Sequence, residues 1–208
     1  MKTYSESAKA AATFVNFKIN ANVAANGNGG GLYVENTLRV TLDSSTLTKN
    51  KVSKGFGGGI YVTNAQNISI SHSPLSENVA LSGGGMFATD KSGVVLIGSN
   101  KVGNIDTEFT STWRMKNNII GGDQLRSGLI EKNDAQIGGG IVISSHTALH
   151  VTGYIISKNT AKFDGGGISV EKCNDISLMD TTIVGNSASS RGGGLYLGKD
   201  VAISLIKN

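Results

Sequence analysis

Short stretches in which hydrophobic and polar residues alternate recur along the whole chain. The hydrophobic members of one set are Leu32 and Val34, Ile60 and Val62, Ile141 and Ile143, Ile168 and Val170, and Leu195 and Leu197. A period of two residues is typical of a β-strand that buries one face. Further alternations follow, such as Ile68-Ile70 and Ile176-Leu178, and then a single aliphatic residue. The pattern predicts an all-β chain with about three short strands in each repeat.

Two sequence markers accompany these strands and repeat with a period of about 27 residues. The first marker is a triple glycine followed by an aliphatic residue or Met, and the triplets begin at Gly29, Gly57, Gly83, Gly138, Gly165 and Gly192. The second is an aliphatic residue three positions before an Asn, in the pairs Ile19/Asn22, Leu47/Asn50, Leu75/Asn78, Ile97/Asn100, Ile130/Asn133, Ile156/Asn159, Ile183/Asn186 and Leu205/Asn208. Strands this short bury a face only when equivalent strands stack, so each repeat is one unit of a solenoid.

The repeats predict a right-handed parallel β-helix of about seven coils. The right hand follows from the strong preference of parallel strand connections. We expect one domain over residues 1–208, with residues 1–18 as an N-terminal cap or a partial coil. Residues 103–128 lack the glycine marker, and we interpret them as one degenerate coil with an extruded loop. Because Asn208 ends the sequence on a marker with no polar cap after it, we expect a segment of a longer protein.

Both markers have a structural reason. Three residues without Cβ let the chain bend sharply and approach the next coil closely. An Asn tolerates left-handed backbone, and its amide can donate to one neighbouring coil and accept from the other. We therefore expect a ladder formed by Asn22, Asn50, Asn78, Asn100, Asn133, Asn159 and Asn186. A glycine-rich phosphate loop needs a following helix, which the repeats do not provide.

Composition and charge exclude several classes of function. Nineteen Lys and Arg against fifteen Asp and Glu give a net charge of +4 without any basic run, so we expect no nucleic-acid partner. The single cysteine, Cys173, excludes an internal disulfide framework. No apolar stretch reaches the length of a transmembrane helix, about 18 residues. The first residues lack the apolar core of a signal peptide, and we expect any export signal to lie outside this segment.

The Gly-Gly-x-aliphatic and apolar-x-x-Asn markers resemble the repeats of the polymorphic outer-membrane protein family of bacterial autotransporters. The likeness extends from about Ile19 to Asn208. It departs from the family in having Gly at the third marker position, where the family has Ala, and Leu or Ile before the Asn, where the family has Phe. The resemblance implies a right-handed β-helical passenger or ectodomain that serves in adhesion or as cell-surface structure.

One column of side chains is a candidate binding surface. The residues that follow the first aliphatic of each coil are expected to point outward, and they are Tyr33, Tyr61, Phe87, Val142, Ser169 and Tyr196. Aromatic residues at these positions favour either a stabilising cross-strand ladder or a platform for a sugar ring or a partner protein. A second column, Lys49, Lys132, Lys158 and Lys207, favours a solvated turn or a stripe for acidic polysaccharide.

The degenerate coil over residues 103–128 is the strongest functional candidate, because it interrupts a regular surface and its loop holds the only Trp, Trp113. The alternative is neutral variation of a loop. The guanidinium of Arg114, next to Trp113, can donate two parallel hydrogen bonds to a carboxylate or a sulfate. We expect a bound partner to contact this loop and the adjacent column, of which Phe87 is closest in sequence.

Catalytic signals are weak. The aspartates are scattered, and His146 and His150 lie too far apart on a strand to share a metal ion. Cys173 is interpreted as a turn or core thiol. We therefore expect no metal and no cofactor. With the resemblance above, we expect an extracellular or cell-surface binding module of the adhesin type. Its expected partner is a host or neighbouring-cell surface protein or glycan. The alternatives are a carbohydrate-active β-helix enzyme, a polysaccharide lyase or hydrolase, and a filament subunit that associates end to end.

Overall fold

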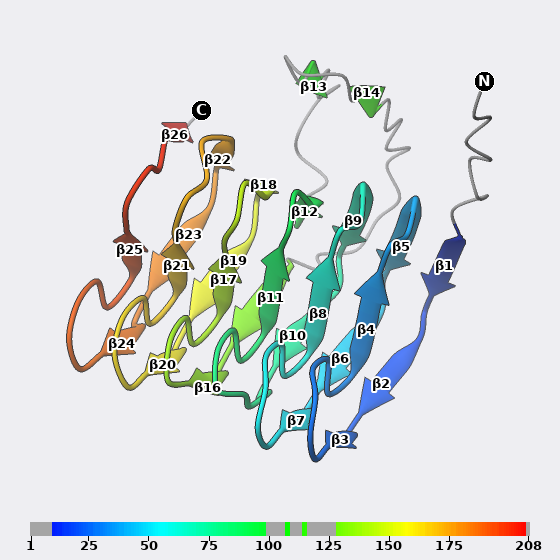
Figure 1. The fold of residues 1–208 in the computed structure, drawn as a ribbon, viewed down its shortest axis with the longest axis horizontal. Coiled ribbons are helices and arrows are strands. Elements are labelled where there is room, and N and C mark those ends of the chain that lie inside the picture. The colour runs from blue at the N-terminus through cyan, green and yellow to red at the C-terminus, as the bar shows by residue number, and fades with distance from the viewer. Residues whose placement is uncertain (1–9, 99–106, 109–113, 116–127, 207–208) are drawn as a thin grey trace, which may run out of the picture.

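A computed structural model describes residues 10–98, 107–108, 114–115 and 128–206 of the protein. These residues wind into a solenoid of six complete coils, followed by the first strand of a seventh, where the sequence predicted about seven coils (Figure 1). The coils stack side by side from the N-terminal to the C-terminal end, and no helix is present in the described ranges. We number the coils 1 to 6 from the N-terminus.

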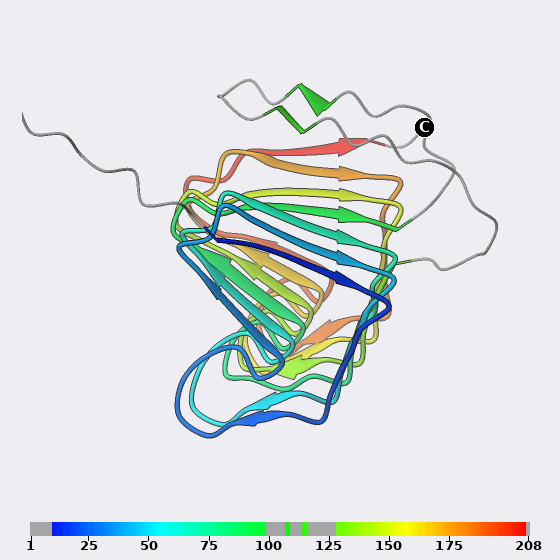
Figure 2. The ribbon, with the colours of Figure 1, turned by 90° about the vertical axis from the view of Figure 1, so that its right-hand side faces the viewer.

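Four parallel sheets run along the solenoid, and each coil contributes one rung to each sheet (Figure 2). The first sheet contains β1 (Ala11–Val15), β5 (Arg39–Asp43), β9 (Asn67–Ser71), β12 (Gly93–Ile97), β18 (Ala148–Thr152), β22 (Ile176–Met179) and β26 (Ile203–Ile206). The second contains β2 (Lys18–Asn20), β6 (Thr46–Thr48), β10 (Leu75–Ser76), β15 (Leu129–Glu131), β19 (Ile155–Ser157) and β23 (Thr182–Val184).

The third sheet has rungs of only two residues, β3 (Val23–Ala24), β7 (Lys51–Val52), β16 (Asp134–Ala135), β20 (Thr160–Ala161) and β24 (Ser187–Ala188), with Val79 bridging Lys51 and Asp134 in coil 3. The fourth contains β4 (Leu32–Glu35), β8 (Ile60–Thr63), β11 (Met86–Thr89), β17 (Ile141–Ile143), β21 (Ile168–Val170) and β25 (Leu195–Leu197). The alternating aliphatic residues point inward and form one continuous core, in which Leu42, Leu47 and Ile60 are fully buried.

The triple glycines form a ladder of backbone hydrogen bonds. In coils 1 to 5 each glycine N–H of the triplet donates to a carbonyl of the next coil, as from Gly139 to Gly165 and from Gly140 to Gly166, both at 3.1 Å. The first glycine of each triplet has a positive φ. A Cβ on Gly140 would lie 2.5 Å from the carbonyl oxygen of Gly167 and 3.1 Å from the amide nitrogen of Asn159. The glycines are therefore required by close approach to the next coil, and not by ligand binding.

The marker asparagines stack inside the turn between the second and third sheets. The side-chain oxygen of Asn133 accepts from the backbone N–H of Asn78 at 2.9 Å and from its side-chain amide at 3.1 Å. The Asn133 amide in turn donates to Asn159 Oδ1 at 2.9 Å and to the carbonyl of Leu75 at 3.0 Å. Because Leu75 is the aliphatic marker residue of coil 3, this bond links the two parts of the repeated motif. The same pattern joins Asn22, Asn50, Asn78, Asn133, Asn159 and Asn186.

Three details of the predicted ladder are wrong. Asn78 bonds directly to Asn133, so Asn100, which lies outside the described residues, is not a rung between them. Ile97 belongs to the first sheet and pairs with Ser71, so it is not a marker aliphatic of the second sheet. The left-handed backbone also belongs to the residue before each Asn, as in Lys132 with φ of 54°. That residue makes the corner, which leaves the Asn side chain free to point inward.

The expected degenerate coil over residues 103–128 is also corrected. In the first sheet β12 pairs with β18, and in the second sheet β10 pairs with β15, so the coils on either side are direct neighbours. Residues 99–127 therefore leave coil 4 between β12 and β15 without adding a rung to these sheets. Of this segment the structure describes only β13 (Thr107–Glu108) and β14 (Arg114–Met115), which pair antiparallel.

Tyr154 fills the interior where this segment leaves the solenoid. It is fully buried, and a Cβ on Gly128 would collide with its ring. From coil 5 its hydroxyl reaches the carbonyl of Ser73 in coil 3, 3.2 Å away. Burial raises the pKa of this phenol far above its ordinary value, so the hydroxyl stays protonated and donates. One aromatic side chain thus spans the coil that the insertion interrupts.

Replacing Asn133 by Ala is expected to lower the free energy of unfolding by about 2–3 kcal/mol, because buried groups of Asn78 and Leu75 lose their partners. The control is Asn174→Ala, since Asn174 is exposed. Urea titration of both variants checks the ladder, and equal stabilities would contradict it.

For Tyr154 we expect two different costs. Tyr154→Ala should destabilise by about 3–5 kcal/mol through the cavity that it leaves, whereas Tyr154→Phe should cost about 1 kcal/mol through the lost hydrogen bond. Denaturant titration measures both, and a small effect of the Ala variant would show that the ring does not support the interior.

Candidate binding surface

Aromatic rings on the outer face of the fourth sheet form a stack along the solenoid. Tyr33 and Tyr61 have ring centroids 5.2 Å apart, and Tyr61 and Phe87 are 5.7 Å apart, with interplanar angles of 15° and 14°. Phe56, from the loop before the glycines of coil 2, stacks on Phe87 at 4.8 Å. We call these four residues, Tyr33, Tyr61, Phe87 and Phe56, the aromatic stripe.

The rings cover one another, which changes their expected role. Tyr33 is 47% exposed, but Tyr61 is only 9% exposed, so the expectation that Tyr61 lies open to solvent is wrong. Burial raises the pKa of the Tyr61 phenol, and the ring stays uncharged at neutral pH. Because stacked rings present mainly their edges, most ring faces are not available to a sugar. The stripe stabilises the sheet and offers an apolar outer surface.

Tyr196 lies apart from the stripe. Val142 and Ser169 occupy the outward positions between Phe87 and Tyr196, and both are buried. The guanidinium of Arg191 lies 4.6 Å from the centroid of the Tyr196 ring and forms two hydrogen bonds to the carboxylate of Asp164, at 3.0 and 2.7 Å. Tyr196 is therefore part of a clamp between coils 5 and 6.

The loops between the third sheet and the glycines differ in length along the solenoid. Six residues separate the ladder Asn from the first glycine in coils 1 and 2, four in coils 3 and 4, and five in coils 5 and 6. The longer loops of the N-terminal coils project further from the body (Figure 2). Large apolar side chains are exposed along this row of loops and the adjoining third sheet, namely Phe56, Val79, Leu81, Ile137 and Phe163.

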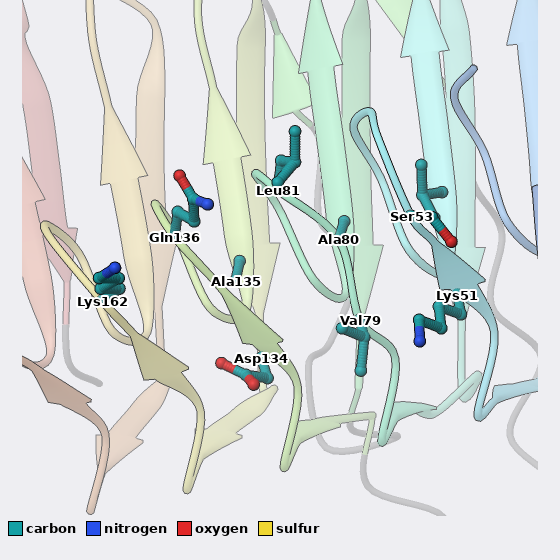
Figure 3. A pocket seen from close by; sticks show the side chains of 10 residues that line it. Lys51, Ser53, Val79, Ala80, Leu81, Asp134, Ala135, Gln136 and Lys162 are labelled. Carbon is teal, nitrogen blue, oxygen red and sulfur yellow. The ribbon is translucent and has the colours of Figure 1, made fainter. Parts of the chain in front are cut away.

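The short loops of coils 3 and 4 leave a hollow of about 480 Å³ (Figure 3). Its lining combines five apolar residues, of which Val79 and Leu81 are exposed, with two lysines, an aspartate, a serine and a glutamine. We call Val79 and Leu81 the floor of the hollow and the polar residues its rim. The hollow is lined by Lys51, Val52, Ser53, Val79, Ala80, Leu81, Asp134, Ala135, Gln136 and Lys162. In Figure 3, Lys51 and Lys162 lie at opposite sides of this surface, with Val79, Ala80 and Ala135 between them.

The described residues contain no group of three or more His, Cys, Asp or Glu that could hold a metal ion. His150 Nε2 lies 3.3 Å from Asp175, and burial lowers the pKa of His150 while the carboxylate opposes that shift. Cys173 is a buried thiol whose pKa is raised by burial. Trp113 lies outside the described residues, and Arg114 belongs to β14, so the role predicted for this loop stays a prediction.

Comparison with known proteins supports the architecture. A family model described as a right-handed beta helix region matches residues 4–208. The chain belongs to the right-handed β-helix family. No curated protein and no solved structure matches the chain. The described part of this β-helix contains no helix with the length and apolarity needed to cross a membrane.

Two features of this β-helix surface were missed by the sequence reasoning. Phe56 joins the stripe from a loop, where the alternation of the strands gives no signal for an outward ring. The hollow follows from the change in loop length between coils 2 and 5, which can be counted in the sequence. The consequence of that count is visible only once the coils are in register.

The stack predicts unequal costs for two tyrosines. Tyr61→Ala is expected to destabilise the β-helix by about 2–3 kcal/mol, because its ring packs between two others, and Tyr33→Ala by about 1 kcal/mol. Urea titration of both variants checks this order, and equal costs would mean that stacking does not decide their contribution.

Proposed function

We propose that this β-helix is a surface-exposed, non-catalytic module that binds a partner protein through the aromatic stripe and the adjoining loops. The observation that carries the proposal is the exposed apolar surface along one side of the solenoid. Its exposed apolar side chains include Tyr33 and Phe56 of the stripe, and Val79, Leu81 and Ile137 of coils 3 and 4. Exposed apolar side chains gathered on one side and bordered by polar residues commonly mark a protein-binding site.

A protein partner fits the stripe better than a glycan does. Sugar rings pack against the open faces of aromatic rings, and in this stack the faces of Tyr61 are covered by Tyr33 and Phe87. Ring edges and aliphatic side chains instead offer the irregular apolar contact area that protein interfaces use.

The location at the cell surface rests on the resemblance of the repeats to autotransporter passengers. The non-catalytic role is supported by the spread of acidic side chains, which give no metal-binding cluster in the described part of the chain. End-to-end self-association is a further candidate, because the terminal coils expose apolar residues such as Phe17, Val23 and Leu205.

The test compares the labelled chain with a Tyr33→Ser/Phe56→Ser double variant on an array of extracellular protein domains and on a glycan array. We expect binding to protein spots and a loss of at least about tenfold in affinity for the double variant, because truncating aromatic anchors commonly costs over 1 kcal/mol each. The matched control is Val184→Ser, which removes an apolar side chain that is 54% exposed in the second sheet.

Binding to glycan spots alone would contradict the proposal. Turnover of pectin, alginate or hyaluronan that one Asp substitution abolishes would establish the enzyme instead. Filaments that grow with concentration, together with unchanged binding by the double variant, would favour self-association.

A further inference from the structure

We propose that the hollow between coils 2 and 5 receives an aliphatic side chain from an acidic, extended segment of the partner protein. This inference rests on the proposed protein-binding function and adds the chemistry of the segment that is bound. The hollow lies beside the stripe in the chain, because residues 79–87 run from its floor through the glycine turn to Phe87.

The floor of the hollow is suited to an aliphatic side chain. Val79 and Leu81 are each 37% exposed although they line a depression, and the buried Ala80 and Ala135 complete the apolar part of its lining. A volume of about 480 Å³ is within the usual range for ligand sites. An apolar floor with a polar rim is also the arrangement found around the buried anchors of protein interfaces.

The surroundings of the hollow are positively charged. In each coil, the stretch around the hollow begins one residue before the ladder Asn and ends just before the first glycine. In coils 2 to 5 these stretches contain six lysines and three acidic residues. The lysines are Lys49, Lys51, Lys54, Lys132, Lys158 and Lys162, and the acidic residues are Glu77, Asp134 and Asp164. Glu77 lies 3.9 Å from Lys49, and Asp164 binds Arg191 of coil 6. Glu131, next to these stretches, lies 3.8 Å from Lys132, and with it the net charge is +2, which favours an acidic partner segment.

The spacing of the rim lysines sets the pattern of the bound segment. Lys51 of coil 2 is in register with Val79, Asp134 and Thr160, so coil 5 lies three strand spacings away, roughly 14 Å. Lys162 lies two residues beyond Thr160, an offset of roughly 7 Å along the strand that the long lysine side chains can span. In an extended peptide, residues i, i+2 and i+4 share one face and i and i+4 are roughly 13 Å apart. The bound segment therefore has an acidic residue at i that faces Lys51 and an acidic residue at i+4 that faces Lys162. The aliphatic residue between them, at i+2, enters the hollow.

Asp134 on the rim adds selectivity at the central position. Its backbone lies between those of Val79 and Thr160 in the third sheet, so a carboxylate at i+2 would meet a like charge there. Lys162 is held near this rim by its own neighbour, because its ammonium lies 5.7 Å from the Phe163 ring centroid. The central residue of the segment is therefore uncharged and apolar.

The experiment uses the full chain and a fluorescein-labelled peptide, Gly-Glu-Ser-Leu-Ser-Glu-Gly, with binding measured by fluorescence anisotropy. Three matched peptides replace the Leu by Ser, the Leu by Glu, or both Glu residues by Lys. We expect the Leu peptide to bind at least about tenfold more tightly than each of the other three.

Variants of the chain locate the site. Leu81→Asp, Lys162→Glu and the hollow-filling Gln136→Trp are each expected to weaken binding of the Leu peptide at least about tenfold. Lys199→Glu, which reverses an exposed lysine of coil 6, should leave the affinity unchanged. Circular dichroism confirms that each variant is folded, and Gln136→Trp keeps the lysines and the floor intact while it occupies the space.

Equal binding of the Leu and Ser peptides, or full binding by Gln136→Trp, would overturn the inference. The inference would also be overturned if heparin bound the chain and Lys162→Glu weakened this binding while Leu81→Asp did not. The hollow would then be an anion site for a sulfated glycan. If the peptide does not bind, but the Tyr33→Ser/Phe56→Ser variant still loses affinity for a protein on the array, then only the role proposed for the hollow is wrong. If the peptides bind as expected, but no protein on the array binds the chain, then the hollow is a binding site and the role proposed for the aromatic stripe is wrong.

Discussion

The pairing of buried backbone and asparagine groups of one coil with the next coil is the constraint on which this structure depends. The turns of each coil lie next to the aliphatic core, so their backbone N–H and C=O groups are shielded from water. These groups form their hydrogen bonds with adjacent coils. The asparagine ladder and the glycine ladder meet this need at two corners. They also touch, because the third glycine of one coil packs against the asparagine of the next, as Gly140 does against Asn159. Neither marker is free to change without the other, which explains why they recur together.

The same constraint explains how the solenoid accommodates a long insertion. Gly98 and Gly128, which flank residues 99–127 in the sequence, are joined by a backbone hydrogen bond of 3.1 Å, and the strands of coil 4 stay paired with both neighbours. The interior at that corner is closed by Tyr154, whose ring and hydroxyl extend from coil 5 to coil 3. A solenoid tolerates insertions at its turns because each coil depends only on its neighbours, provided that the core stays filled. Here a single aromatic residue meets that condition.

Variation is concentrated where the ladders do not reach. The loops that precede the glycines carry no ladder residue, so their lengths vary from coil to coil, and the outward positions of the fourth sheet tolerate both aromatic and small side chains. The aromatic stripe and the hollow arise from this freedom. Both place apolar side chains on the surface at a stability cost that the ring stacking partly offsets. The binding surface that we propose is therefore built on the positions that the repeat leaves unspecified.

Sequence alone determined the local features of this protein. Period-two alternation predicted the strands, and the spacing of Asn and Gly predicted the parallel β-helix and six rungs of the asparagine ladder, because these requirements recur in every coil. Tertiary structure decided everything that depends on register between coils. An aliphatic residue three before an Asn also occurs by chance, and the pairing of Ile97 with Ser71 and the direct bonds from Asn78 to Asn133 separate Asn100 from the true rungs. The burial of Tyr61, the reach of Tyr154 and the hollow beside Leu81 likewise bring together residues of different coils. No local pattern encodes them, because their partners are 26 or more residues away and are chosen by stacking.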